Sequence, residues 1–263
     1  MQIANKKFLV TGAGNGMGRE VAFELLRRGA TVVAIDINES FLAETVALAG
    51  ADAQRLSTSR LDISDRNAVI EFSAHHKDLD GLVNVAGIIQ PFVRVEQLQS
   101  EQIDRVMYVN FFGPLNLIHA FLPTLKSRPT AHILNVSSMG SYAPVPGQTI
   151  YGASKAALNL LTEGLRSELS ETNVKLTLVW PGAIGTNIAG NSGIAMPAGS
   201  AADAPAMKMV APADAGKAMV DAMASDKKRI YIGQDAKLLG RIAQFSTDMA
   251  AKLIYKNLKH LLG

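Results

Sequence analysis

Thr11-Gly12-Ala13-Gly14-Asn15-Gly16-Met17-Gly18 is the stretch that decides the fold of this 263-residue chain. The apolar run 8–10 before it predicts a strand, and apolar residues at helical spacing after it predict a helix over 19–28. The glycines permit a sharp turn and a close approach of the backbone to its neighbours. Such a turn directs several N–H groups and the positive end of a helix at one point, where an anionic pyrophosphate fits.

A second apolar run, 31–35, predicts another strand, and it ends on Asp36. An acidic residue about 20 positions after such glycines can accept hydrogen bonds from the ribose hydroxyls of adenosine. Asp36 could instead cap the helix that we expect to begin near Glu39, and the two roles are compatible. The glycine turn and Asp36 together predict a dinucleotide site.

Strand patterns alternate with helical patterns along the rest of the chain. The further strands are expected at 55–61, 80–87, 131–136, 174–180 and 229–233, and the helices at 39–49, 64–75, 100–122, 151–171 and 212–225, with Ser64 as one N-cap. This alternation predicts crossover units, and continuous apolar strands predict a sheet that is covered on both faces. We therefore expect an α/β fold with a doubly wound, Rossmann-type, mostly parallel seven-stranded sheet flanked by helices on both faces.

The composition favours one globular unit. The chain is 48% hydrophobic, contains no cysteine and carries a net charge of +3. These values exclude a disulfide framework and a thiolate metal site, and they agree with a cytoplasmic protein. The start of the chain lacks a signal-peptide pattern, and no apolar run approaches the ~18 residues that a membrane span requires. We assign 1–235 to one dinucleotide-binding and catalytic domain and 236–263 to a C-terminal helix extension.

The chemistry is expected from Tyr151 and Lys155, which lie four residues apart at a predicted helix start and so share a face. A free tyrosine titrates near ~10, and a cation one turn away favours the phenolate. Ser138 ends a predicted strand and can hydrogen-bond a carbonyl or alkoxide oxygen. Each feature alone occurs by chance in many proteins, so the combination with the glycine turn carries the interpretation.

The sequence resembles the short-chain dehydrogenases/reductases over roughly residues 5–235. The motifs, in the family's order, are Thr-Gly-x-x-x-Gly-x-Gly at 11–18, Asp62-Ile63, Asn84-x-Ala86-Gly87, Asn110, Ser138, Tyr151-x-x-x-Lys155 and Pro181-Gly182-x-Ile184-x-Thr186. Val85 stands where the family commonly has a second Asn. The residues on both sides of Val85 are retained, so we expect little effect.

This resemblance implies a role for four catalytic residues. Tyr151 exchanges the hydroxyl proton, and Lys155 lowers the pKa of Tyr151 and also binds the nicotinamide ribose. Ser138 holds the substrate oxygen, and Asn110 supports a water chain that leads from Lys155 to solvent. The resemblance also implies the cofactor-binding residues, which are Gly12, Asn15, Gly16, Met17, Gly18, Asp36, Asp62, Ile63, Asn84, Ala86, Gly87, Tyr151, Lys155, Pro181, Gly182, Ile184 and Thr186.

Asp36 predicts NAD as the cofactor, because its carboxylate would repel the 2′-phosphate of NADP. Relatives that use NADP usually carry Lys or Arg near this point, where this chain has the neutral Asn15 and Ile37. The leading hypothesis is therefore an NAD-dependent oxidoreductase that interconverts a secondary alcohol and a ketone. The alternatives are an NADPH-dependent carbonyl reductase and an NAD(H)-binding redox sensor with weak catalysis.

The segment 187–207 is small, apolar and rich in Gly and Ala, with Asp203 as its one charge. It is expected to form either a lid over an apolar substrate or merely a flexible loop. The tail 227–263 carries eight Lys and Arg against two Asp, a net charge of +6. Its apolar residues recur every three to four positions, which predicts a basic amphipathic helix that packs on protein or lies on an anionic membrane.

The remaining expectations concern partners. Members of the resembled family are commonly homotetramers or homodimers, and we expect the same here. Nucleic-acid binding is not expected, because the basic region is one helix without an aromatic stacking platform. No metal site is expected, since the histidines lack a ligand spacing.

Overall fold

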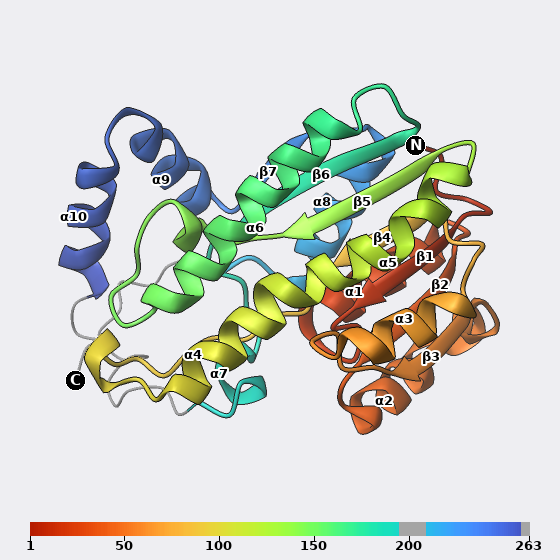
Figure 1. The fold of residues 1–263 in the computed structure, drawn as a ribbon, viewed down its shortest axis with the longest axis horizontal. Helices are drawn as coiled ribbons and strands as arrows, with labels where there is room; N and C mark the ends of the chain where they lie inside the picture. The colour runs from red at the N-terminus through yellow and green to blue at the C-terminus, as the bar shows by residue number, and fades with distance from the viewer. Residues whose placement is uncertain (195–208, 259–263) are drawn as a thin grey trace.

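The computed structural model describes residues 1–194 and 209–258 (Figure 1). Within these ranges seven strands form one sheet in the order β3-β2-β1-β4-β5-β6-β7, with every pair parallel. The strands are β1 (Lys7–Thr11), β2 (Thr31–Asp36), β3 (Leu56–Arg60), β4 (Gly81–Asn84), β5 (Ala131–Val136), β6 (Val174–Pro181) and β7 (Arg229–Ile232). The strand order reverses direction at β1, so the crevice for a ligand opens beyond the carboxyl ends of β1 and β4.

Helices cover both faces of this sheet, which confirms the predicted fold class. One face carries α1 (Gly16–Arg27), α2 (Glu39–Ala49) and α8 (Pro212–Ala224), and the other carries α3 (Arg66–Ala74), α5 (Gly113–Ser127) and α6 (Thr149–Glu168). Two shorter helices, α4 (Ser100–Met107) and α7 (Ile188–Asn191), lie on the side of the sheet where the strands have their carboxyl ends (Figure 1).

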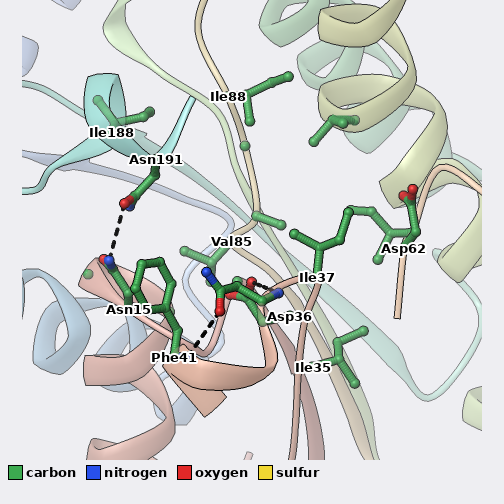
Figure 2. Close-up of a pocket in the computed structure, with 18 of the residues that line it drawn as sticks. Asn15, Ile35, Asp36, Ile37, Phe41, Asp62, Val85, Ile88, Ile188 and Asn191 are labelled. Carbon is green, nitrogen blue, oxygen red and sulfur yellow. Dashed lines mark hydrogen bonds between the residues drawn. The ribbon is translucent and has the colours of Figure 1, made fainter. Parts of the chain in front are cut away.

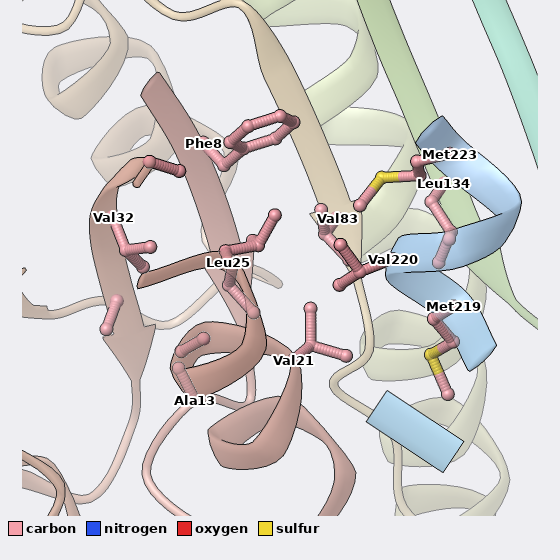
Figure 3. Packing of buried hydrophobic residues seen from close by; sticks show 14 of the residues in the cluster. Phe8, Ala13, Val21, Leu25, Val32, Val83, Leu134, Met219, Val220 and Met223 are labelled. Carbon is pink, nitrogen blue, oxygen red and sulfur yellow. The ribbon is translucent and has the colours of Figure 1, made fainter. Parts of the chain in front are cut away.

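The core on the α1 face shows why the central strands are apolar without interruption, whereas the edge strand β3 is polar and largely exposed. Phe8 of β1, Leu25 of α1 and Val220 of α8 are completely buried and belong to the same cluster (Figure 3). Burying a side chain of this size contributes roughly 1.5–3 kcal/mol. The opposite face has its own cluster around Phe121 of α5, so the sheet is apolar on both sides. This double cover fixes the strand ends that build the site.

The helix predicted over 100–122 is interrupted. A π-helical turn, Tyr108–Phe112, separates α4 from α5 and contains Asn110. Pro114 follows this turn and has no N–H to donate to the carbonyl of Asn110, which explains why the α-helical ladder fails there. The expected cap of α3 was also wrong: Asp65, not Ser64, accepts from the backbone N–H groups of Asn67 and Ala68.

The tail differs from the single helix that we expected. It contains α9 (Gln234–Phe245) and α10 (Thr247–Leu258), separated by Ser246 in an extended conformation. The Ser246 hydroxyl accepts from Met249 N at 3.2 Å, so a second helix starts immediately. Ala250 and Ile254 of α10 are buried in a small cluster with residues of the same chain, so this part of the tail packs on its own protein. The last tail residues, 259–263, lie outside the described residues. Among those described, no helix has the length and apolar character to cross a membrane.

Candidate active site

The glycine turn joins β1 to α1, and two of its positions require glycine. Gly12 has φ +65°, and a Cβ there would lie 3.0 Å from the Cα of Ala86. A Cβ on Gly18 would collide with the carbonyl oxygen of Gly12. The turn therefore packs against the loop after β4 and against itself, which leaves the start of α1 open toward the space beyond the sheet.

Asp36, at the end of β2, faces this turn. One carboxylate oxygen accepts from Gly14 N at 3.0 Å, and the other accepts from Asn38 N at 3.0 Å. The cap of α2 is Asn38, whose side chain accepts from the N–H groups of Ser40 and Phe41. The alternative role of Asp36 as a helix cap is therefore wrong, and Asp36 lines the crevice instead (Figure 2).

A cavity of about 450 Å³ opens beside the turn (Figure 2). The predicted cofactor residues that line it are Gly12, Asn15, Gly16, Met17, Gly18, Asp36, Asp62, Ile63, Ala86, Gly87 and Thr186. Its lining combines a helix N-terminus, apolar side chains and a carboxylate, which fits the pyrophosphate, the adenine and the ribose of a dinucleotide. Sequence reasoning missed other lining residues, among them Phe41, Ile88, Arg105, Tyr108 and Asn191.

Two contacts hold the walls of this cavity together. The buried Thr11 hydroxyl accepts from Val85 N at 3.0 Å and from Ala86 N at 2.9 Å, which ties the end of β1 to the loop after β4. Val85 takes part through its backbone N–H, which any residue except proline supplies. Across the mouth, Asn15 Nδ2 donates to Asn191 Oδ1 at 3.3 Å (Figure 2).

The Asn84 side chain is engaged within the sheet. It is buried and donates to Asn135 Oδ1 at 2.8 Å, and Asn135 in turn donates to Thr162 of α6 at 2.9 Å. Asn84 is not a lining residue of the cavity, because its side chain ties β4 to β5. The chain of amides then fixes α6 against the sheet.

Three further predicted cofactor residues, Pro181, Gly182 and Ile184, follow β6 and are not among the lining residues of the cavity. Ile184 pairs with Val210 and packs on the core. A residue that sequence reasoning missed, Asp235, holds this loop by accepting from Ala183 N at 2.7 Å. Asp235 comes 52 residues after Ala183 in the chain, and no motif spacing indicated it.

Ser138 and Tyr151 form one half of the predicted catalytic set. The Ser138 hydroxyl accepts from Gly140 N at 3.0 Å and makes a side-chain hydrogen bond with Tyr151 in the first turns of α6. Gly140 lies between them: a Cβ there would be 3.5 Å from Ser138 Oγ and 3.6 Å from Tyr151 Cε1. A substrate oxygen bound here would meet two hydroxyl groups at once.

Lys155 and Asn110 meet at Gly87 and form the other half. A Cβ on Gly87 would lie 3.1 Å from Lys155 Nζ and 3.3 Å from Asn110 Oδ1. The Asn110 side-chain amide accepts from Ile88 N at 2.9 Å and donates to Ile88 O at 2.9 Å. It also donates to Ser154 Oγ at 3.1 Å. The π turn therefore places Asn110 between the loop after β4 and α6. Because Gly87 also lines the cavity, this half of the predicted catalytic set borders the cavity.

The pKa values of the two titratable groups differ from the simplest expectation. Burial raises the pKa of the Tyr151 phenol, and the hydrogen bond with Ser138 opposes this rise with a smaller effect. The expected lowering by Lys155 is not seen. Burial also lowers the pKa of Lys155 itself to about 8. Both groups are thus tuned mainly by the loss of water around them.

Comparison with known proteins places this site in a family. The model of the short chain dehydrogenase family matches residues 6–196, which include the glycine turn and the Tyr151 and Lys155 pair. This chain belongs to the short chain dehydrogenase family. A protein of Mycobacterium tuberculosis named "Putative oxidoreductase SadH" is 32% identical over 259 residues, covering 95% of this chain and 94% of that protein. The chain is therefore an oxidoreductase of this family.

Solved structures agree with this assignment. A short chain dehydrogenase from Burkholderia cenocepacia in complex with NADP is 29% identical, with a TM-score of 0.81 over 97% of this chain and 99% of that chain. A family member from Burkholderia phymatum in complex with NAD has a TM-score of 0.83, covers 95% of this chain and 97% of that chain, and is 23% identical, so it supports the fold alone.

Proposed function

We propose that this chain is an NAD-dependent oxidoreductase that interconverts a secondary alcohol and a ketone on an apolar substrate. The observation that carries the proposal is the junction at Gly87, where Lys155 and Asn110 meet beside the cavity, one helical turn from the Tyr151–Ser138 pair. A bound nicotinamide dinucleotide would supply the hydride acceptor or donor. The protein supplies the proton chemistry and the binding geometry.

The residues divide the proton chemistry between them. In alcohol oxidation, Tyr151 accepts the hydroxyl proton while Ser138 holds the oxygen that loses it. Lys155 passes that proton on, and Asn110 supports the water chain that carries it from Lys155 toward solvent. In ketone reduction the same groups work in reverse, and Tyr151 donates its proton to the developing alkoxide. A positively charged nicotinamide nearby would favour the Tyr151 phenolate, so oxidation should be favoured by higher pH.

Residues for holding the dinucleotide are present on three strand ends. The start of α1 at Gly16 and Met17 would receive the pyrophosphate, and Asp36 would accept from the adenosine ribose. Asp62 and Ile63 line the other end of the cavity, where adenine would lie. Asp36 favours NAD over NADP by charge repulsion. The NADPH-dependent reductase is the second candidate, since a relative of this fold was solved with NADP.

The substrate class rests on the segment after Thr186. Its described part begins with α7 and is anchored by Ser192, whose hydroxyl accepts from Ile89 N at 3.0 Å and donates to Ile188 O at 2.7 Å. The remainder of the proposed lid, 195–207, lies outside the described residues and includes Asp203. Its small apolar sequence favours an uncharged alcohol or ketone with a hydrophobic body.

A panel of secondary alcohols and ketones tests the proposal. NADH absorbance would be followed with each compound, with NADP in parallel and Tyr151→Phe as the catalytic control. We expect turnover of apolar compounds with NAD that the Tyr151→Phe protein loses. Wild-type turnover with NADP alone would favour the reductase, and dinucleotide binding without turnover of any compound would favour the redox sensor. Turnover confined to phosphorylated sugars would reject the substrate class.

Assembly and membrane contact remain proposals about the tail. We propose a homodimer or homotetramer, and a peripheral membrane contact as the weaker alternative. The hairpin of α9 and α10 exposes Phe245, Met249 and Tyr255. Met249 lines a shallow groove together with Lys252 and Lys256. Truncation after Gly233 separates the two: loss of assembly supports subunit packing, whereas loss of liposome co-sedimentation alone supports membrane contact.

A further inference from the structure

We propose that Gln90 is a positioning residue that holds Tyr151 in place by capping the start of α6. The Gln90 side-chain oxygen accepts from Ile150 N at 2.7 Å and from Tyr151 N at 3.0 Å. Gln90 is 1% exposed and lies three residues beyond Gly87, in the loop after β4. The inference rests on the proposed function, because it assigns Gln90 a role through the acid/base residue.

The first N–H groups of any helix lack partners within the helix. In α6 the residue at the N-cap position, Gln148, makes no side-chain hydrogen bond to these groups. Gln90 reaches them from another part of the chain. Because both partners are backbone donors, the Gln90 oxygen and not its nitrogen must face the helix. The orientation of this amide is therefore fixed by chemistry.

A third hydrogen bond joins the same two segments, and here the donor lies at the start of α6 and the acceptor in the loop after β4. Gln148 Nε2 donates to the backbone carbonyl of Gln90 at 2.7 Å, and Gln148 is itself 4% exposed. The loop after β4 and the start of α6 are thus joined by three hydrogen bonds that involve these two glutamines. The same loop lines the cofactor cavity at Gly87 and Ile88. The phenol of Tyr151 is held relative to the cofactor site through this connection.

The neutral amide suits this position better than a carboxylate would. An oxygen acceptor is needed for the two N–H groups, but a negative charge next to Tyr151 would oppose the phenolate and raise its pKa. The titratable groups nearest this junction along α6 are Tyr151 and Lys155, both of which are shifted by burial. Gln90 therefore supplies the cap without adding a charge.

Two substitutions separate capping from charge. Gln90→Met keeps the approximate shape and removes the acceptor, whereas Gln90→Glu keeps an acceptor and adds a charge. Asp65→Ala is the matched control, because Asp65 caps α3 through two backbone N–H groups and does not line the cavity. Hydrogen exchange of the peptide covering 149–154 reports on the cap without requiring turnover.

For Gln90→Met we expect exchange at 149–154 to accelerate and kcat to fall by at least about tenfold, since small misplacement of a catalytic group costs up to ~10²-fold. The Kd for NAD should change by less than about threefold, because Gln90 does not line the cavity. For Gln90→Glu we expect exchange near the wild-type rate and an acid limb of activity shifted to higher pH. Asp65→Ala should lower stability and leave both kcat and the pH profile unchanged.

The proposal would be overturned if the peptide 149–154 of Gln90→Met exchanged hydrogen at the wild-type rate. It would also be overturned if Gln90→Met lost no more kcat than Asp65→Ala does. If Gln90→Met does not fold, an unchanged pH profile in Gln90→Glu would overturn it equally. If the wild-type protein turns over no alcohol or ketone, the proposed function fails, and the exchange measurement still decides whether Gln90 holds Tyr151.

Discussion

Lys155 donates a hydrogen bond of 3.0 Å to the carbonyl oxygen of Val136, the last residue of β5. The ammonium is buried at this point, with the whole residue 3% exposed. Burial lowers the pKa of Lys155 to about 8, from an ordinary value of 10.5. Keeping the Lys155 ammonium protonated in this buried place lowers the free energy of unfolding, and the size of this cost depends on pH.

Lys155→Met should remove this pH dependence. Between pH 8 and 10.5 the unfolded chain still binds the proton that the folded protein has released, so wild-type stability rises with pH across this window. We expect the wild-type free energy of unfolding to gain roughly 3 kcal/mol relative to Lys155→Met over that range. Urea unfolding of both proteins at several pH values measures the difference, and parallel pH curves would contradict it.

Gly18→Ala should disrupt the cofactor turn. The added methyl group would collide with the carbonyl oxygen of Gly12, so the turn must move away from the start of α1. We expect NAD affinity to fall by at least tenfold, about 1.4 kcal/mol, as measured by titration calorimetry. Gly164→Ala in α6 is the control, because a Cβ there meets open space. That substitution should raise stability by roughly 0.5–1 kcal/mol and leave NAD binding unchanged.

Asp36→Ala should relax the choice of cofactor. In the wild-type protein we expect NAD to be preferred at least tenfold, about 1.4 kcal/mol, because the 2′-phosphate of NADP would face the carboxylate. The variant should have a smaller ratio of kcat/KM with NAD to kcat/KM with NADP, mainly because its kcat/KM with NADP improves. Glu39→Ala, which removes a nearby charge that does not line the cavity, should keep the wild-type ratio. Equal use of both cofactors by the wild-type protein would reject the NAD assignment.

His132 should make the protein sensitive to acid. The Thr177 hydroxyl donates to Lys227 O at 2.6 Å, so it accepts from His132 Nε2 at 2.8 Å, which places a proton on Nε2 of the buried ring. Burial lowers the pKa of His132 from 6.5 to about 4, although Asp226 opposes this shift. As the pH falls from 6.5 to 4, the unfolded chain binds a proton that the folded protein refuses, so stability is lost.

His132→Gln should therefore lose less stability than the wild-type protein over this range, by roughly 3 kcal/mol. Thermal unfolding at pH 4, 5 and 6.5 measures the difference. The exposed His75→Gln serves as the control and should follow the wild-type curve. If His132→Gln and the wild-type protein lose stability equally with acid, the buried neutral histidine is not responsible.

Much of the fold could be predicted from local pattern. Continuous apolar strands, and helices such as α2 with the predicted bounds 39–49, follow from short-range periodicity. The π turn at Tyr108–Phe112 was missed because the pattern over 100–122 was interpreted as one helix, although Pro114 lacks the N–H that the α-helical ladder needs there. The break at Ser246 was likewise hidden within an apolar spacing that continues on both sides.

The candidate site could be predicted where its residues form short motifs, in which each residue works together with others close to it in the sequence. Residues that act across the fold were missed: Thr11 binds the loop after β4, Asp235 holds Ala183, and Gln90 caps α6. The hydrogen bond from Asn84 to the buried Asn135 was likewise missed, because the motif does not reveal which way the Asn84 side chain points. Such pairings depend on the register between strands.

The α9–α10 hairpin has one more consequence. It lies beside β7 at one end of the molecule (Figure 1), and its small buried cluster includes Ala143, a few residues after Ser138. An element held by so little buried surface opens at a lower free energy than the sheet. Warming should therefore detach the hairpin first and free the Ser138 segment, so that heat inactivation sets in below the temperature at which the whole protein melts.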